Sequence, residues 1–436
     1  MKTYYQKVVN CLERKVKKLA ADKYSLDLVK DTNKDFSRNR KLDFENLMKS
    51  VIFMSGKPIK EELYDYFGYN PSTATASAFV QQRDKLKPAA FESLLKMINK
   101  SYPCVKRYRD YRLIAVDGSD LCISYDINDK DTFVFHGDQK GYNIIHVNSA
   151  YDLLNHRYVD TIIRESSHLG EQYSMYTMAE RFDDKAIFIA DRNYSTLNNM
   201  EHIIKAKQMF LLRCKDINSN GLLKKFAFPD KEFDTDIDLI LTTKQNNEIK
   251  ANPGKYRFLS TSSTFDFVDS EHPFYPVHYR VVRFKVDGNE EYESIITNLN
   301  RNCFPLSEIK KLYNLRWGIE ISFRHLKYSA DLSALHCRKR NSIQQEIWAR
   351  LILYNISMIM SEEAVNHSSC KKLKYDYYLN ITRCIHIIRN LTKRKGGIPP
   401  NLDKLLIKEL LPIRPGRLDP RKVKHQSVVC FNYRFS

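Results

Sequence analysis

The chain has 436 residues, of which 43% are hydrophobic, so global disorder is excluded and several folding units are expected. The formal net charge of +19 at pH 7 favours a polyanionic partner, most often nucleic acid, over a surface that is simply basic. The most apolar stretch, residues 347–360, is too short to cross a bilayer and contains Arg350 and Asn355. We therefore interpret it as a buried helix and expect no membrane contact.

The excess positive charge is concentrated at the two ends of the chain. Residues 371–436 hold sixteen Lys or Arg against four Asp or Glu, and residues 1–40 hold eleven against five. The middle is close to neutral, which fits a core that two basic arms hold on DNA. Nine cysteines are irregularly spaced and no apolar run follows Met1, so we expect reduced thiols and a cytoplasmic location.

Residues 1–105 are predicted to be helical. Apolar residues recur at helical spacing in KVVNCLERKVKKL, whose other side is basic, and FENLMKSVIFM and EELYDYF follow. Gly68 is suited to end a helix and Pro88 to begin one. Two short helices joined by a turn resemble a helix-turn-helix, although a simple helical bundle fits equally well. We interpret this segment as a helical N-terminal DNA-binding region.

From Tyr111 onward, strands alternate with helices. Strands are predicted for YRLIAVDGSDL, DTFVFHGD, YNIIHVNSAYDLL, AIFIADRNYS and MFLLRCK. Helices are predicted for HLGEQYSMYTMAERF and STLNNMEHIIKAKQ. This order predicts a mixed α/β sheet, which we expect to form the first part of a catalytic core over residues 106–214.

The second half of the chain begins with a different composition. Residues 215–300 are rich in Thr, Ser, Asp and Lys with short β-prone runs, and the runs flanking Asp287-Gly288 predict a hairpin. We expect a β-rich insertion here rather than a continuation of the sheet. Residues 301–365 are predicted to be helical and to complete the core. Residues 366–436 form a basic C-terminal region, helical to about residue 395 and then rich in proline and extended.

Two acids follow apolar runs. Asp117 comes after RLIAV and Asp191 after AIFIA, so both are predicted to end strands of one sheet, where ligands commonly bind. Two carboxylates at such a position are suitable ligands for Mg²⁺ or Mn²⁺. Asp-Gly and Asp-Arg-Asn also form ordinary turns, and for either acid alone that interpretation is favoured.

A third acid lies on a predicted helix. At about 100° per residue, five polar side chains fall within an arc of roughly 80° on one face: Tyr313, Arg316, Glu320, Arg324 and Lys327. A neighbouring apolar stripe is predicted to pack against the sheet: Leu312, Leu315, Ile319, Phe323 and Leu326. A solvated face with helical salt bridges would explain the charges but not a polar face that borders the core. Trp317 beside this face is interpreted as a core residue, with stacking on a displaced base as the alternative.

The spacing Tyr313-x2-Arg316-x3-Glu320-x6-Lys327, with AVDGSDL and IADRNYS upstream, resembles the Y-R-E-K signature of the insertion-sequence-four family of bacterial DDE transposases. The resemblance covers roughly residues 40–360. It implies an RNase H-like core interrupted by a β-rich insertion, and a site for Mg²⁺ or Mn²⁺ formed by the catalytic acids Asp117, Asp191 and Glu320. It also implies DNA contacts from Tyr313, Arg316 and Lys327, to which we add Arg324 and Arg192 as basic neighbours of the acids.

The function that these features imply is cut-and-paste transposition of a bacterial insertion sequence. A nucleoid-associated homodimer would bind terminal inverted repeats in double-stranded DNA, hydrolyse the ends and transfer them to target DNA by in-line phosphoryl transfer. One alternative is an RNase H-like endonuclease without strand transfer. The other is a non-catalytic DNA-binding protein derived from a transposase, although the sequence retains all three acids.

Overall fold

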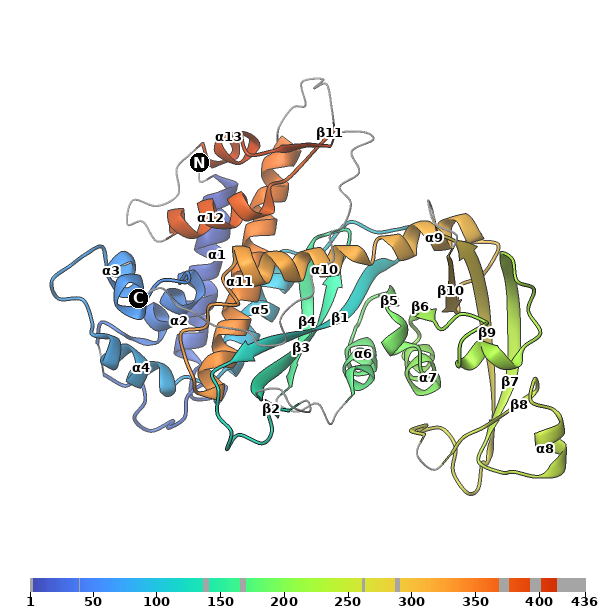
Figure 1. The fold of residues 1–436 in the computed structure, drawn as a ribbon. Coiled ribbons are helices and arrows are strands. Elements are labelled where there is room, and N and C mark those ends of the chain that lie inside the picture. The colour runs from blue at the N-terminus through green and yellow to red at the C-terminus, as the bar shows by residue number, and fades with distance from the viewer. Residues whose placement is uncertain are drawn as a thin grey trace.

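The computed structural model describes residues 3–38, 40–135, 141–164, 170–260, 263–286, 291–367, 376–392 and 401–413. A large mixed sheet lies at the centre, and Figure 1 shows most of the helices at one end of it. At the opposite end the sheet continues as a group of long strands (green to yellow in Figure 1).

The N-terminal region is helical, as predicted. Side chains of Thr3, Asp43 and Thr75 cap three of the helices by accepting a hydrogen bond from a backbone N–H of the first turn. Gly68 ends another helix in the left-handed conformation, with φ of 69°, which glycine adopts without steric cost. The helices are α1 (Tyr4–Ala21), α2 (Phe44–Phe53), α3 (Ile59–Phe67), α4 (Ala76–Asp84) and α5 (Ala89–Ser101).

Ten strands within the described residues form one sheet in the order β2-β3-β1-β5-β6-β10-β9-β7-β8, with β4 paired to β3. β1, β3 and β4 are antiparallel neighbours, whereas β5 and β6 run parallel to β1. The strands are β1 (Arg112–Ile123), β2 (Phe133–Val134), β3 (Tyr142–Asp152), β4 (Arg157–Arg164), β5 (Ala186–Ala190), β6 (Met209–Cys214), β7 (Phe233–Thr242), β8 (Tyr256–Phe258), β9 (Phe274–Lys285) and β10 (Tyr292–Thr297).

The segment 215–300 is rich in strands, as predicted, but it continues the central sheet, so the expectation that it stands apart from the sheet is wrong. β10 pairs with β6 through Ser294–Thr297, and β9 and β7 extend the sheet outward. The physical reason is that the apolar side chains of Ile295 and Ile296 complete both hydrophobic cores beside β6. β9 and β10 are antiparallel neighbours, while the predicted turn at Asp287-Gly288 lies outside the described residues.

Helices cover both faces of the sheet because the strands alternate their side chains between two cores. Leu113 and Ala115 of β1 face one core, and Ile114 and Val116 face the other. The second core is completed by α6 (Glu171–Glu180) and α7 (Leu197–Lys205). The first core is completed by α9 (Leu306–Asn314), α10 (Trp317–Arg324) and α11 (Arg340–His367). The remaining elements are α8 (Asn247–Ala251), α12 (Ile381–Thr392), α13 (Leu402–Ile407), β11 (Asp376–Tyr378) and β12 (Leu411–Ile413).

α11 is the helix around which the N-terminal and C-terminal helices pack (Figure 1). The apolar run at residues 347–360 lies inside it and is buried, as predicted. None of the described helices has the length and apolar content that a membrane crossing requires. A buried ion pair joins α4 to α11, because Arg83 donates from Nη1 to Oε1 of Glu346 at 2.7 Å and from Nε to Gln345 at 2.9 Å.

The buried pair generates a stability prediction. Arg83→Leu leaves the Glu346 carboxylate buried beside an apolar side chain, so we expect a loss of about 3–5 kcal/mol in the free energy of unfolding. Urea unfolding followed by circular dichroism measures this loss. Arg107→Leu is the matched control, because Arg107 forms its ion pair with Asp184 at the surface and should contribute less than about 1 kcal/mol. Equal losses for the two variants would contradict the prediction.

Candidate active site

Asp117 and Asp191 lie at corresponding positions on neighbouring parallel strands. The β1–β5 ladder ends with Ala115 opposite Ile189, and each acid lies two residues further along its chain. The prediction that both acids end strands holds for Asp191, which directly follows β5. It is wrong for Asp117, because β1 continues to Ile123 and pairs Asp117 with Ser149. The antiparallel partner β3 is longer than β5 and keeps β1 extended beyond the acid.

Both acids point to the sheet face that α10 covers. Side chains alternate along a strand, so Asp117 shares its face with Leu113 and Ala115, which belong to the core beneath α9, α10 and α11. The side chain of Asp191 accepts a hydrogen bond from the backbone N–H of Asn193 at 2.9 Å and caps the short helix Arg192–Tyr194. This bond fixes the carboxylate directly after the strand.

Glu320 lies on α10 and is held by Arg316. Oε1 of Glu320 accepts a hydrogen bond from Nη2 of Arg316 at 2.8 Å. Both members of this pair affect the pKa of Asp117: attraction by Arg316 lowers that pKa, and repulsion by Glu320 raises it. The three acids thus belong to one electrostatic neighbourhood. Across the described ranges, however, no three His, Cys, Asp or Glu side chains stand together at metal-ligand spacing.

Burial dominates the electrostatics of Asp117. It raises the pKa of this carboxyl to about 7, with smaller upward contributions from Asp191 and Glu320. The hydrogen bond from the N–H of Gly118 to Oδ1, at 2.9 Å, opposes the shift. A carboxyl with such a pKa changes its protonation state near neutrality, and a cation nearby would stabilise its charged form.

Small residues let α10 approach the sheet closely. A Cβ on Gly318 would stand 2.9 Å from Cδ2 of Leu153, so a larger residue here would require the Leu153 side chain to move. One turn later, the buried hydroxyl of Ser322 donates to the carbonyl of Ile319 at 2.7 Å and accepts from the hydroxyl of Tyr158 at 2.8 Å. These two contacts fix the rotation of α10 about its axis and hence the direction of Glu320.

The polar face predicted for residues 313–327 is split between buried and exposed positions. Tyr313 is 3% exposed and Arg316 is 6% exposed, and the Tyr313 hydroxyl and the Arg316 Nε are buried without a hydrogen-bond partner. Arg192 and Arg324 are exposed. Lys327 donates from Nζ to the carbonyl of Asp120 at 3.0 Å. The DNA contacts assigned to these five residues stay predictions.

The cause of this split is a change of helical winding. Between Leu312 and Ile319 several backbone N–H groups bond three residues back, and α9 gives way to α10 at Arg316. In such tight turns each residue rotates further about the helix axis than it does in an α-helix. As a result Leu315, predicted to be buried, is 43% exposed, whereas Leu312, Ile319, Phe323 and Leu326 are buried, as predicted.

Trp317 is exposed rather than part of the core, so that interpretation is wrong. It exposes 46% of its surface beside Glu320, and the Arg316 guanidinium lies 4.9 Å from the centre of its ring. Ile321 and Tyr328 are also exposed along this helical segment. The same change in winding accounts for the difference, because it rotates Trp317 outward while Arg316 turns inward.

Arg213 belongs to the site but was missed from the sequence. The β5–β6 pairing aligns Ala190 with Leu212. Continuing this register by one residue places Arg213 of β6 opposite Asp191. Its Nη1 lies 3.3 Å from Oε1 of Glu293. Burial raises the pKa of Tyr313 to about 12, and the charge of Arg213 is one of the smaller effects that oppose this rise. The sequence signal that could have identified Arg213 is a basic residue in the predicted strand that follows the strand of Asp191.

His146 bridges two acids beside the site. Its Nδ1 lies 2.6 Å from Asp120 and its Nε2 lies 3.1 Å from Glu171. Burial alone would lower the pKa of His146, but the bonds to the two carboxylates outweigh it and raise the pKa to about 9. The ring occupies the space above Gly118, where a Cβ would stand 2.5 Å from Nε2. The structure therefore gives His146 a bridging role between Asp120 and Glu171.

The raised pKa of His146 generates a pH-dependent prediction. Its bridge should stabilise the fold fully below pH 6.5 and lose this effect as pH rises through about 9. His146→Gln should therefore cost roughly 1–3 kcal/mol at pH 6 and much less at pH 10. Urea unfolding at both pH values measures the difference from the unmodified chain. His272→Gln, at an exposed histidine, is the control. A loss of unfolding free energy in His146→Gln that does not depend on pH would contradict the prediction.

Comparisons with known proteins were made on sequence and fold. The sequence profile of the family described as "Transposase DDE domain" matches residues 108–356. A probable transposase for insertion sequence element IS5377 of Geobacillus stearothermophilus is 22% identical over 224 residues, which are 50% of this chain and 49% of that protein. Transposase InsG for insertion sequence element IS4 of Escherichia coli (strain K12) is 29% identical over 137 residues, 28% of this chain and 29% of that protein.

Each of these alignments spans half or less of the relative's own length. Among solved structures, the piggyBac transposase synaptic complex with hairpin DNA covers 94% of this chain and 87% of its own, with 11% identity and a TM-score of 0.42. The family profile matches more than half of the 436 residues, and the matched range contains Asp117, Asp191 and Glu320. The chain therefore belongs to the DDE transposase family and resembles its insertion-sequence-four type.

Proposed function

We propose that this chain is a transposase that cuts a bacterial insertion sequence out of DNA at its terminal inverted repeats and joins the freed ends to target DNA. The observation that supports the proposal is that Asp117 and Asp191 take corresponding positions on neighbouring parallel strands, with Glu320 of α10 close enough to affect the pKa of Asp117, inside the range that matches the family. Following the family resemblance, the active form would be a homodimer that holds two ends.

The strand order supports an RNase H-like core within this proposal. Five neighbouring strands follow the order β4-β3-β1-β5-β6, with β3 antiparallel to β1 and with β5 and β6 parallel to it. A parallel pair beside a longer antiparallel strand brings two acids together at adjacent positions. Residues 106–214 and 301–365 would form this core, and the strands from 215–300 would extend its sheet.

The acids fit a divalent cation by their chemistry. Carboxylate oxygens are preferred ligands of Mg²⁺ and Mn²⁺. Burial, with a smaller contribution from the neighbouring acids, raises the pKa of Asp117, and a bound cation would oppose that rise. Asp117, Asp191 and Glu320 would hold it, and Glu320 would have to be shared with, or released by, Arg316. When bound, such a cation supplies activation of the attacking oxygen and stabilisation of the leaving oxygen.

The side chains around the acids would position the DNA. Arg192 and Arg324 are exposed near Asp191 and Glu320 and are suited to phosphate contacts. Lys327 lies beside the β1 backbone next to Asp120. Tyr313 and Arg316 are buried; Arg316 holds Glu320, and its guanidinium lies 5.8 Å from the centre of the Tyr313 ring. Contact of these two side chains with DNA would require them to become exposed. Trp317 offers an exposed ring on which an unstacked base could lie.

The proposed reaction is tested by Glu320→Gln. With a plasmid carrying the element's terminal repeats and Mg²⁺, we expect cleavage to fall by roughly 10³-fold or more, while binding of the repeat DNA changes little. Gel assays of cleavage and of binding measure the two quantities. Glu308→Gln is the matched control, because Glu308 lies on α9 outside the site and forms an ion pair with Arg109.

Two outcomes would contradict this proposal. Cleavage by Glu320→Gln at the rate of the unmodified chain would remove Glu320 from the mechanism. Cleavage without joining of pre-cut ends to a target plasmid would favour an RNase H-like endonuclease instead.

The metal site has a test that does not depend on cleavage. Without metal, ionised Asp117 should destabilise the fold by about 1–4 kcal/mol above pH 7, and this cost should vanish as pH falls towards 4. Asp117→Asn should therefore melt at a higher temperature than the unmodified chain at pH 8. Mn²⁺ should raise the melting temperature of the unmodified chain but not that of Asp117→Asn.

Asp110→Asn, at an exposed acid just before β1, serves as the control for the metal site and should retain the stabilisation by Mn²⁺. Equal stabilisation of Asp117→Asn by Mn²⁺ would place the cation elsewhere.

A further inference from the structure

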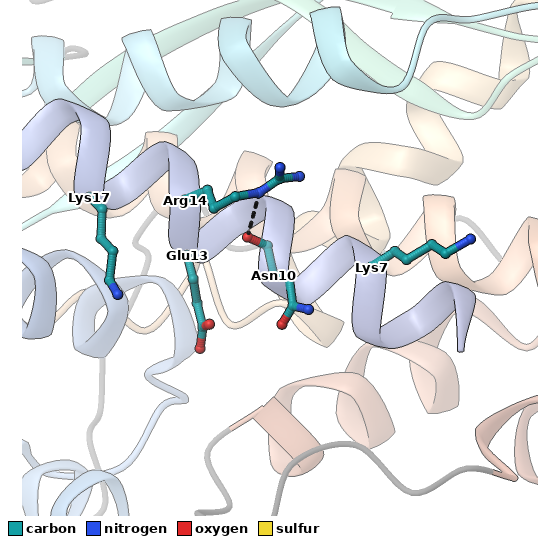
Figure 2. Close-up of a pocket in the computed structure, with 5 residues that line it drawn as sticks. All are labelled: Lys7, Asn10, Glu13, Arg14 and Lys17. Atoms are coloured by element: carbon teal, nitrogen blue, oxygen red, sulfur yellow. Dashed lines mark hydrogen bonds between the residues drawn. The ribbon is translucent and has the colours of Figure 1, made fainter. Parts of the chain in front are cut away.

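α1 divides into an apolar side and a basic side. The apolar side packs into the core through residues at helical spacing: Tyr5, Val8, Leu12, Val16 and Leu19. The rest of the helix surface, which we call the α1 basic face, carries five cations within twelve residues: Lys7, Arg14, Lys15, Lys17 and Lys18. Figure 2 shows the side chains of Lys7 and Lys17 extending from the helix, whereas the Arg14 side chain lies along it and donates from Nε to the carbonyl of Asn10 at 3.4 Å.

Among the described residues, no carboxylate neutralises the cations of the α1 basic face. Within the part of the chain that the structure describes, none of the five lies within 4.0 Å of an acidic oxygen, whereas Lys57, Lys96 and Arg107 each form an ion pair. Glu13 is the one acid among the residues that line the first hollow described below. Unneutralised cations at this density favour an anionic partner.

The α1 basic face is also hollowed. One hollow of about 400 Å³ is lined by α1 alone: Lys7, Asn10, Glu13, Arg14 and Lys17 (Figure 2). A second of about 410 Å³ lies between α1 and the end of α5 and is lined by Cys11, Arg14, Lys15, Lys18, Ser101 and Tyr102. Arg14 lines both hollows.

We propose that the α1 basic face binds the sugar-phosphate backbone of duplex DNA, independently of base sequence. The twelve helical residues from Lys7 to Lys18 span about 16 Å, enough to meet several phosphates of one duplex. Flexible lysines act as point charges for phosphate rather than as readers of base edges. The amides of Gln6 and Asn10, which could read bases, hydrogen-bond to each other at 2.9 Å. This inference deepens the proposed function by assigning the first helix to backbone contact.

The test compares two double variants of the full chain. Arg14→Gln with Lys18→Gln removes two cations of the α1 basic face. Lys57→Gln with Lys96→Gln removes two exposed cations that already have acidic partners, so both variants lose the same net charge. Affinity for a random-sequence duplex without terminal repeats is measured by fluorescence anisotropy at several salt concentrations. EDTA is present, so that cleavage does not contribute.

We expect the α1 variant to bind more weakly, with the slope of log affinity against log salt reduced by about 1.8, because each lost phosphate contact contributes about 0.9. The control variant should keep the slope of the unmodified chain. Arg14→Lys with Lys18→Arg should restore it. Equal thermal melting of all variants shows that the folds are intact.

Three results would overturn the inference. These are an unchanged slope in the α1 variant, an equal loss in the control variant, or a loss confined to duplexes that carry the terminal repeats. None of these measurements depends on strand transfer. A chain that binds duplex DNA through α1 but fails to transpose would contradict the proposed function and leave this inference standing.

Discussion

The arrangement of the site depends on one electrostatic constraint, which is that an acidic side chain occupies an otherwise apolar face of the sheet. Asp117 follows Leu113 and Ala115 on the face that α9, α10 and α11 bury. Burial makes its ionised form costly, as its raised pKa indicates, and Asp191 and Glu320 add repulsion. Arg316 provides the compensating charge. The inward position of Arg316, the close approach of α10 and the bond between Ser322 and Tyr158 all serve to keep this balance.

Much of this arrangement follows from local sequence patterns. Alternation and helical spacing predicted the strands before Asp117 and Asp191, the buried helix at residues 347–360 and the helix that carries Glu320. These predictions succeed because each element has one strongly apolar side that must be buried. The closeness of the three acids could be inferred only by adding the family resemblance, since it depends on the pairing of β1 with β5.

Other features depend on contacts that no local pattern encodes. The switch from α9 to α10 rotates Trp317 outward and Arg316 inward, and uniform helical geometry cannot reproduce it. Arg213 acquires its place beside Asp191 only through the register of two strands. The continuation of the sheet through β10 likewise reflects long-range pairing, because β6 and β10 are separated by about eighty residues.

The buried pair between Arg83 and Glu346 has a consequence for the order of folding. The two residues are separated by 263 positions, and α1, α2, α4 and α5 all contact α11. During synthesis the first hundred residues leave the ribosome long before the helix on which they pack. Their apolar surfaces then lack a native partner until α11 has emerged, which makes this stretch a substrate for chaperones and slows its folding through high contact order. A polypeptide released before α11 would expose those surfaces permanently.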